Sequence, residues 1–191
     1  MQLVGRGADA TAIVLGIGIA AFSLYAFPTE TALASCLLGW SMLAIAAIDA
    51  RRFTIPDVLS VPSIVLGLLA TGSMLDPSVR QLVSVDHVIG AFLGGAALWL
   101  VRDAHFRLRG YEGLGLGDVK LAAAGGAWAG WHNLADIILL AAAAALSFVI
   151  ARALVRRKSL SGTERIAFGT FLAPSVWVVW SLSELARGPT N

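Results

Sequence analysis

The chain has 191 residues, of which 58% are hydrophobic and only 14% are charged, and its formal net charge is +2. Charged residues make up about a quarter of a soluble domain, so this composition excludes a soluble globular protein. Apolar stretches of roughly twenty residues recur, and the alternating segments of about ten residues that a β-barrel needs are not seen. The composition therefore predicts an all-α, polytopic transmembrane helical bundle, one domain over residues 1–191, with no nucleic-acid partner.

Seven apolar segments are predicted to be transmembrane helices, at residues 10–27, 31–48, 57–75, 83–101, 118–131, 134–154 and 166–185. The first segment is long for a secretory signal, and Asp9 precedes it, so we expect a retained helix; cleavage near residues 32–34 is the alternative. Pro62 lies in the first turns of the third segment, where it bends the helix or is accommodated by neighbouring helices. The longest polar stretch, residues 102–117, is expected to be a loop.

Basic residues favour this layout with a cytoplasmic N-terminus, because short cytoplasmic links are enriched in Lys and Arg. The predicted outer links hold only Arg80 and Arg187, and Lys120 lies just inside the fifth segment. The asymmetry arises only if the fifth segment crosses the membrane. The predicted inner links hold eleven basic residues: Arg6, Arg51, Arg52, Arg102, Arg107, Arg109, Arg152, Arg156, Arg157, Lys158 and Arg165.

The fifth segment is short, because about 13 residues of helix cover only some 20 Å. Ala122, Gly126 and Gly130 recur in it at every fourth residue. Small residues at this spacing allow the backbones of membrane helices to approach closely. We therefore expect the fifth segment to be central in the bundle.

The predicted chemistry depends on two acidic residues. Asp49 directly follows the second segment, and Asp118 opens the fifth, so both fall at cytoplasmic helix ends, where they can meet. Adjacent carboxylates share a proton; the ionised one activates water and the protonated one polarises a carbonyl, as in aspartic proteases. Helix dipoles favour Asp118 as the base and Asp49 as the acid, whereas Arg51 and Arg52 oppose that role for Asp49.

Four glycines precede Asp118, at positions 110, 113, 115 and 117. We expect Gly113, Gly115 and Gly117 to allow positive φ angles and the close approach of an extended peptide. Structural interpretations stay open, because glycines are common before helices and an acid at a helix start is a good cap. Asp49 is also explained as a marker of the membrane boundary.

The sequence Gly115-Leu116-Gly117-Asp118-Val119-Lys120-Leu121, continued by Gly126-Ala127-Trp128-Ala129-Gly130-Trp131, resembles the type IV prepilin peptidase family and its Gly-x-Gly-Asp core. Ile48-Asp49 and Ile55-Pro56-Asp57 match this family as well. Residues 166–173 are similar to a family segment that usually reads Pro-Phe-Gly-Pro-Phe-Leu. Ala167 and Thr170 stand where the prolines usually occur, which leaves the fine shape of the seventh segment open. The resemblance covers about residues 37–173.

The resemblance implies a membrane aspartic endopeptidase that cleaves the basic leader from prepilins or pseudopilins at the cytoplasmic side of the bacterial inner membrane. Asp49 and Asp118 map onto its catalytic pair, and no metal or cofactor is implied. Bifunctional members of the family carry a cysteine-bearing insertion and also N-methylate the new N-terminus. This chain lacks that insertion and has one cysteine, Cys36, so it looks like the short, peptidase-only form.

Two alternatives remain open. A presenilin-like intramembrane protease shares the Gly-x-Gly-Asp motif, although the chain is short for that group and has no Pro-Ala-Leu sequence. A small proton-coupled transporter or assembly factor would use the aspartates as a proton relay. Peptidase activity would survive in detergent, whereas transport would depend on a proton gradient.

Four further residues support the motif: Gly115, Gly117, Lys120 and Asp57. Asp57 is interpreted as a capping or substrate-positioning residue, in a helix start where Thr54 is the N-cap and Pro56 lies in the first turn. Lys120 either tunes Asp118 or extends to lipid headgroups.

Other polar residues are given structural roles. The spacing of two histidines and two acids on the predicted outer side fits no metal-site pattern, so we expect no metal there. Cys36 is expected to be a packing residue, and its being alone excludes an intramolecular disulfide. The basic run 156–158 is expected to meet anionic lipid headgroups. The four outer-side residues are Asp86, His87, His132 and Asp136.

Overall fold

The structure is a computed structural model that describes residues 2–74, 77–111, 113–156 and 166–188. Within these ranges the protein is all-helical, with seven α-helices and no strand, as the sequence predicts. The helices are α1 (Gln2–Ala26), α2 (Thr29–Arg52), α3 (Asp57–Met74), α4 (Pro77–Arg109), α5 (Leu116–Ala129), α6 (Leu134–Arg156) and α7 (Gly169–Arg187).

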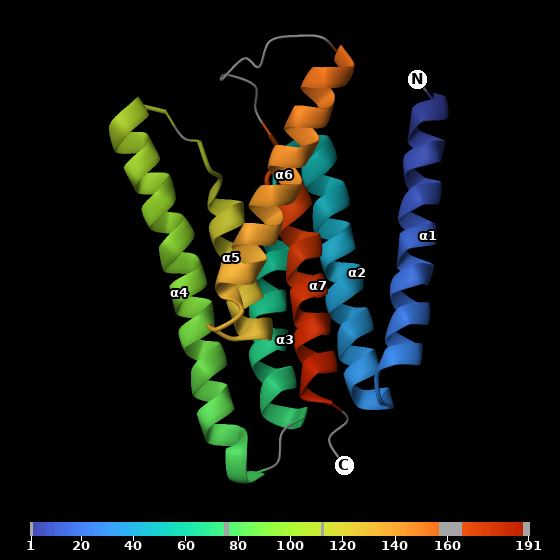
Figure 1. Cartoon of the computed structure of the whole chain (residues 1–191), viewed down its shortest axis with the longest axis vertical. Helices are drawn as coiled ribbons and strands as arrows, with labels where there is room; N and C mark the ends of the chain where they lie inside the picture. The colour runs from blue at the N-terminus through green and yellow to red at the C-terminus, as the bar shows by residue number, and fades with distance from the viewer. Residues whose placement is uncertain (1, 75–76, 112, 157–165, 189–191) are drawn as a thin grey trace.

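Successive helices run in alternating directions, so their links gather at the two ends of the bundle (Figure 1). The ends of α2, α4 and α6 and the starts of α3, α5 and α7 lie toward the upper end in this view. α1 stands at one margin, where it packs against α2. α5 contacts α3, α4, α6 and α7, which confirms the expected central position of the fifth segment.

Three helical spans in the described residues are long and apolar enough to cross a membrane, judged by length and composition: Thr29–Arg52, Ser84–Arg109 and Leu134–Val155. Two shorter apolar helices accompany them, Ala10–Ala26 and Asp57–Thr71. This pattern makes the chain a membrane protein, because so many apolar side chains remain on the outside of the bundle.

The polar stretch 102–117 is not a loop over its whole length, contrary to the sequence-based expectation. α4 continues to Arg109, and Gly110 ends it with a φ of 75° and an N–H bond to the Phe106 carbonyl of 2.8 Å. Polar side chains are compatible with a helix that leaves the hydrocarbon, and Arg107 pairs with Asp103 four residues earlier at 2.7 Å. The apolar pattern thus marks where the membrane segment stops and not where the helix stops.

α5 is too short to cross a hydrocarbon core by itself. Its 14 residues make a helix of about 21 Å, against a core of about 30 Å. In Figure 1 it ends well above the lower ends of α3, α4 and α7, where Gly130 turns the chain into α6. The fifth segment therefore forms a short inner helix, and its crossing of the membrane stays a prediction.

Glycines bring α4 and α5 into backbone contact along the predicted small-residue stripe. A Cβ on Gly90 would lie 2.5 Å from the Gly126 carbonyl and 2.8 Å from the Gly130 carbonyl carbon. A Cβ on Gly94 would collide with the Ala122 carbonyl. Neither helix tolerates a side chain at these crossing points, so the position of α5 depends on them.

The core lies between α2, α5 and α7, and its largest buried side chains include Leu38, Met42 and Ile45 from α2. Trp128 of α5 donates its indole N–H to the Ser63 carbonyl of α3 at 2.8 Å. α3 remains helical through Pro62, which is thus accommodated rather than helix-ending. Cys36 is buried, in agreement with its expected packing role.

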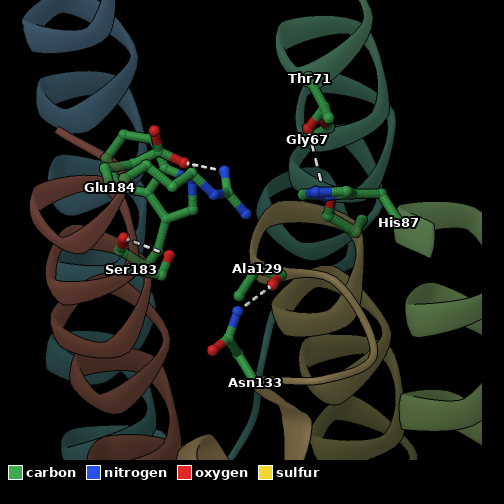
Figure 2. Close-up of polar contacts among 10 residues, drawn as sticks. Gly67, Thr71, His87, Ala129, Asn133, Ser183 and Glu184 are labelled. Atoms are coloured by element: carbon green, nitrogen blue, oxygen red, sulfur yellow. Dashed lines mark hydrogen bonds and ion pairs between the residues drawn. The ribbon is translucent and has the colours of Figure 1, made fainter. Parts of the chain in front are cut away.

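Buried polar contacts join the helices at the end of α5 that is remote from Asp118. His87 of α4 faces Thr71 of α3, as Figure 2 shows, with 3.2 Å between its Nδ1 and the threonine Oγ1. The same Nδ1 lies 2.9 Å from the Ala127 carbonyl of α5. Asn133 turns back to donate to the Ala129 carbonyl at 2.6 Å (Figure 2). These contacts thus give hydrogen-bond partners to two carbonyl groups near the C-terminal end of α5, those of Ala127 and Ala129.

We expect Gly94→Ala to lower the free energy of unfolding by about 1–3 kcal/mol, because the added methyl group overpacks the α4–α5 crossing. Gly95→Ala on the same helix is the matched control, since its Cβ would meet Ala123 Cβ at an ordinary 3.5 Å. The control should be neutral or stabilised by up to about 1 kcal/mol, because alanine favours helices more than glycine. Tryptophan fluorescence during thermal unfolding in detergent measures both, and equal midpoints would contradict the crossing.

Candidate active site

Asp49 lies in the last turn of α2 and is buried. Its Oδ2 accepts a hydrogen bond from the backbone N–H of Thr170 at 2.9 Å and faces the Thr170 hydroxyl at 3.4 Å. α2 ends three residues later at Arg52, and the next residue, Phe53, adopts a left-handed conformation with a φ of 54°. The carboxylate is therefore fixed by the first turn of α7, which is 121 residues away in sequence.

Asp118 is the third residue of α5 and is buried as well. Its Oδ2 accepts a hydrogen bond of 3.2 Å from the Gly115 N–H, one of the amides that a helix start leaves without an internal partner. Its Oδ1 is buried and has no hydrogen-bond partner among the described residues. The capping interpretation of Asp118 is thus correct for one oxygen, while the other remains free for chemistry.

Ile55 lies between Gly117 of α5, which precedes Asp118, and Gly169 of α7, which lies against Asp49. A Cβ on Gly117 would lie 2.7 Å from Ile55 Cβ, and a Cβ on Gly169 would lie 2.6 Å from Ile55 Cδ1. The same Gly169 Cβ would lie 2.8 Å from Asp49 Oδ2. Ile55 therefore joins the surroundings of the two acids at one end of the bundle, where a charge on Asp49 acts unfavourably on a charge on Asp118.

This arrangement suits proton transfer to and from a bound molecule. Two neighbouring carboxylates ionise together only at a high cost, so one proton is readily shared between them. A pair of this kind titrates as a unit. The site therefore holds a base and an acid at once, which is what the addition of water to a carbonyl requires.

Helix dipoles do not separate the roles of the two acids, contrary to the expectation from sequence. That expectation considered only the C-terminus of α2 at Asp49. The N-terminus of α7 also faces Asp49 through Thr170, and its dipole acts in the opposite sense. Both acids thus lie against a helix N-terminus, Asp118 in α5 and Asp49 beside α7.

The glycines before Asp118 act through close approach and not through positive φ. Among the described glycines, positive φ occurs at positions 110, 130 and 188, and Gly115 has a φ of −76°. Gly117 gives room to Ile55, as described above. A Cβ on Gly113 would lie 2.6 Å from the ring of His105, whose Nδ1 is 3.2 Å from the Tyr111 carbonyl. The expected positive φ at Gly113, Gly115 and Gly117 is therefore wrong. The close contacts at Gly113 and Gly117 are made by side chains of this chain, and the approach of an extended peptide stays a prediction.

Lys120 pairs with Asp57, with 2.6 Å between Nζ and Oδ1. This ion pair joins the first turn of α3 to the first turn of α5, so it supports the helix start that carries Asp118. α3 begins at Asp57, and the Pro56 carbonyl accepts the N–H groups of Leu59 and Ser60, both at 3.1 Å. Pro56 is therefore the N-cap, and the prediction of Thr54 in that role is wrong by two residues.

The outer-side polar residues separate into different contacts. Asp86 pairs with His132 at 3.0 Å, whereas His87 is buried against Thr71 and Ala127. Asp136 lies exposed in the first turn of α6. The basic run 156–158 was expected to contact lipid; residues 157 and 158 lie outside the described residues.

Three residues of the site were not predicted as such: Ile55, Gly169 and Thr170. Each belongs to a stretch quoted above for the family resemblance, but none carries a titratable group that would single it out. A polar residue directly after glycine at the start of an apolar segment is the one available signal for Thr170.

The chain is similar to known proteins that share one name and to the model of one protein family. Residues 36–150 match the model of the type IV leader peptidase family. The prepilin leader peptidase/N-methyltransferase of Aeromonas hydrophila is 37% identical over 147 residues, which are 76% of this chain and 48% of that protein. The protein of the same name from Pseudomonas aeruginosa is 40% identical over 147 residues, with the same coverage.

The protein of that name from Dickeya chrysanthemi is 38% identical over 134 residues, 70% of this chain and 44% of that protein. The chain thus spans about half the length of the curated relatives it matches. No solved structure gives a significant match.

Proximity of the two acids is testable without an activity assay. In a Cys36→Ala background, we expect Asp49→Cys and Asp118→Cys together to be joined within one molecule by a short bifunctional thiol reagent. Mass spectrometry of the digested protein detects the bridged peptides. Asp86→Cys with Asp118→Cys is the matched control, since Asp86 lies against Gly130 near the end of α5, about 18 Å along the helix from Asp118. Equal yields from both pairs would contradict the site.

Proposed function

Since the chain belongs to the type IV leader peptidase family, we propose that it is a membrane aspartic endopeptidase that removes the leader peptide from prepilin-like proteins. The observation that carries the proposal is that Asp49 and Asp118 are both buried at one end of the bundle, where Ile55 packs against Gly117 next to Asp118 and against Gly169 next to Asp49. In this proposal the whole bundle is one peptidase domain, and these two residues are its catalytic pair.

The dyad begins the reaction with one shared proton. The ionised carboxylate takes a proton from a water molecule, and the water oxygen bonds to the scissile carbonyl carbon. The protonated carboxyl gives its proton to the carbonyl oxygen, so a neutral tetrahedral diol forms. When the diol collapses, the C–N bond breaks and the amine nitrogen receives the proton that the dyad holds. One diol hydroxyl becomes the carbonyl and gives its proton to the dyad. The products are a free carboxyl and a free amine, and the site returns to its starting state.

The hydrogen-bond contacts of the two acids before the reaction are compatible with this cycle. Asp118 Oδ1 is the buried oxygen without a partner in the described part of the chain, so it is available to a water molecule. Asp49 is held at Oδ2 by the start of α7. Gly117 and Gly169 both lie closely against Ile55, which packs the start of α5 and the start of α7 together beside the acids.

The orientation proposed is an inner-membrane protein with the N-terminus and the active site at the cytoplasmic side. Arg51, Arg52, Arg107 and Arg109 lie at the same end of the bundle as the two acids and are exposed. Basic residues are enriched at cytoplasmic membrane surfaces, where they also meet anionic lipid headgroups. A prepilin or pseudopilin would then present its leader at this surface, with its hydrophobic helix in the bilayer.

We propose peptidase activity without methylation of the product. The curated relatives carry both activities in their names. The bifunctional form that the resemblance implies has a cysteine-bearing insertion, whereas the one cysteine of this sequence, Cys36, is buried in α2. Mass measurement of the mature product distinguishes a free from a methylated N-terminus.

We expect Asp49→Asn and Asp118→Asn each to lower cleavage of a co-expressed prepilin by at least about 100-fold, because each removes one half of an acid–base pair. Gel shift and N-terminal sequencing of the product measure the cleavage in cells and in detergent. Asp136→Asn is the matched control, since this carboxylate is exposed at the start of α6. Full cleavage by either active-site variant would contradict the dyad, and cleavage that requires a proton gradient would favour transport.

A further inference from the structure

We propose that Thr170 is a positioning residue for Asp49: its N–H and hydroxyl hold Oδ2 of this carboxylate at the start of α7 and so fix its orientation. The inference deepens the proposed peptidase function and rests on it for its catalytic consequence. The contact itself can be tested independently of activity.

The evidence begins with the first turn of α7, whose N-terminal amides lack partners inside the helix. Phe171 and Leu172 donate their N–H groups to the Phe168 carbonyl, at 2.9 and 3.0 Å. Thr170 differs because its N–H points to Asp49 Oδ2 at 2.9 Å, with a longer contact of 3.2 Å to the Ala167 carbonyl. The amide of Thr170 therefore gives this helix start a short hydrogen bond to Asp49, beside a further backbone contact from Gly169.

The hydroxyl of Thr170 adds a second contact to the same oxygen. Thr170 Oγ1 lies 3.4 Å from Asp49 Oδ2, so the N–H and the hydroxyl of Thr170 both contact this oxygen. Gly169 completes the seat, because a Cβ there would lie 2.8 Å from Oδ2 and 3.1 Å from Cγ of Asp49. The Asp49 carboxylate thus packs closely against the backbone of α7, which restricts its rotation.

The residue type at position 170 determines whether Asp49 Oδ2 has these two hydrogen-bond donors. A proline carries no backbone N–H and no hydroxyl, so it would supply neither contact. Proline is nonetheless compatible with the first turn of a helix, where its fixed φ fits. The replacement therefore removes the donors without a large cost to the helix, which makes it a suitable test.

The experiment compares Thr170→Pro, Thr170→Val and Thr170→Ser. Valine keeps the N–H and the branched shape but loses the hydroxyl, and serine keeps both donors. Thr29→Pro is the matched control, because Thr29 is the first residue of α2, at the end remote from the acids. Each protein is purified whole in detergent, with its aspartate carboxyl carbons labelled with carbon-13.

Infrared difference spectra between each variant and the wild type give a readout that a general loss of stability would not reproduce. The band that disappears in Asp49→Asn is assigned to Asp49, and the band that disappears in Asp118→Asn is assigned to Asp118. We expect Thr170→Pro to move the Asp49 band, Thr170→Val to move it less, and Thr170→Ser and Thr29→Pro to leave it in place.

Steady-state cleavage of a purified prepilin gives the catalytic consequence. We expect Thr170→Pro to lower kcat roughly ten-fold or more, Thr170→Val to lower it a few-fold, and KM to change less than about two-fold, since the contact lies on the enzyme's own acid. Thr170→Ser should retain activity near that of the wild type.

The possible outcomes separate this inference from the proposed function. An Asp49 band that stays in place in a folded Thr170→Pro protein would overturn the contact. A wild-type kcat in that variant, with Asp49→Asn inactive, would overturn the positioning role. If the wild type cleaves no prepilin but the Asp49 band still moves, the contact is supported and the peptidase function is contradicted.

Discussion

Asp49 and Asp118 repel each other whenever both are ionised, and burial strengthens that repulsion because water no longer screens it. The fold has to hold them together against this force. It does so with two helix N-termini, which present amide donors to the acids: Gly115 before α5 and Thr170 in α7. The ion pair between Lys120 and Asp57 fastens the start of α5 from the other side, although an exposed pair adds only about 0–1 kcal/mol.

The shortness of α5 is part of the same solution. A small-residue helix can lie against α4 with its backbone in contact, because Gly90 and Gly94 offer no side chains at the crossings. Contacts to α3, α6 and α7 then surround α5 on its other sides. Its N-terminus is fixed inside the bundle, and Asp118 is brought beside α2 and α7. Gly117, expected from the sequence to admit a peptide, packs against Ile55.

Sequence reasoning succeeded where one local pattern decides the structure. Apolar segment lengths predicted the seven helices, and the Gly-x-Gly-Asp motif predicted a helix start within two residues of Leu116. It failed where polarity and helix formation separate, as in the extension of α4 to Arg109. It also failed for Lys120, because the partner Asp57 is 63 residues away and no spacing rule connects the two.

The two acids differ in how far their supports extend along the chain. Gly115 and Asp118 are three residues apart, so that contact forms wherever α5 forms, and the sequence motif is sufficient to predict it. Thr170 and Asp49 are 121 residues apart, so their contact forms only when α2 and α7 pack in register. That register depends on buried side chains of α2, such as Leu38 and Met42, and on Leu172 and Val176 of α7. Core packing between α2 and α7 is therefore part of the active site, because a small displacement of α7 would remove the donor from Asp49 while Asp118 kept its own.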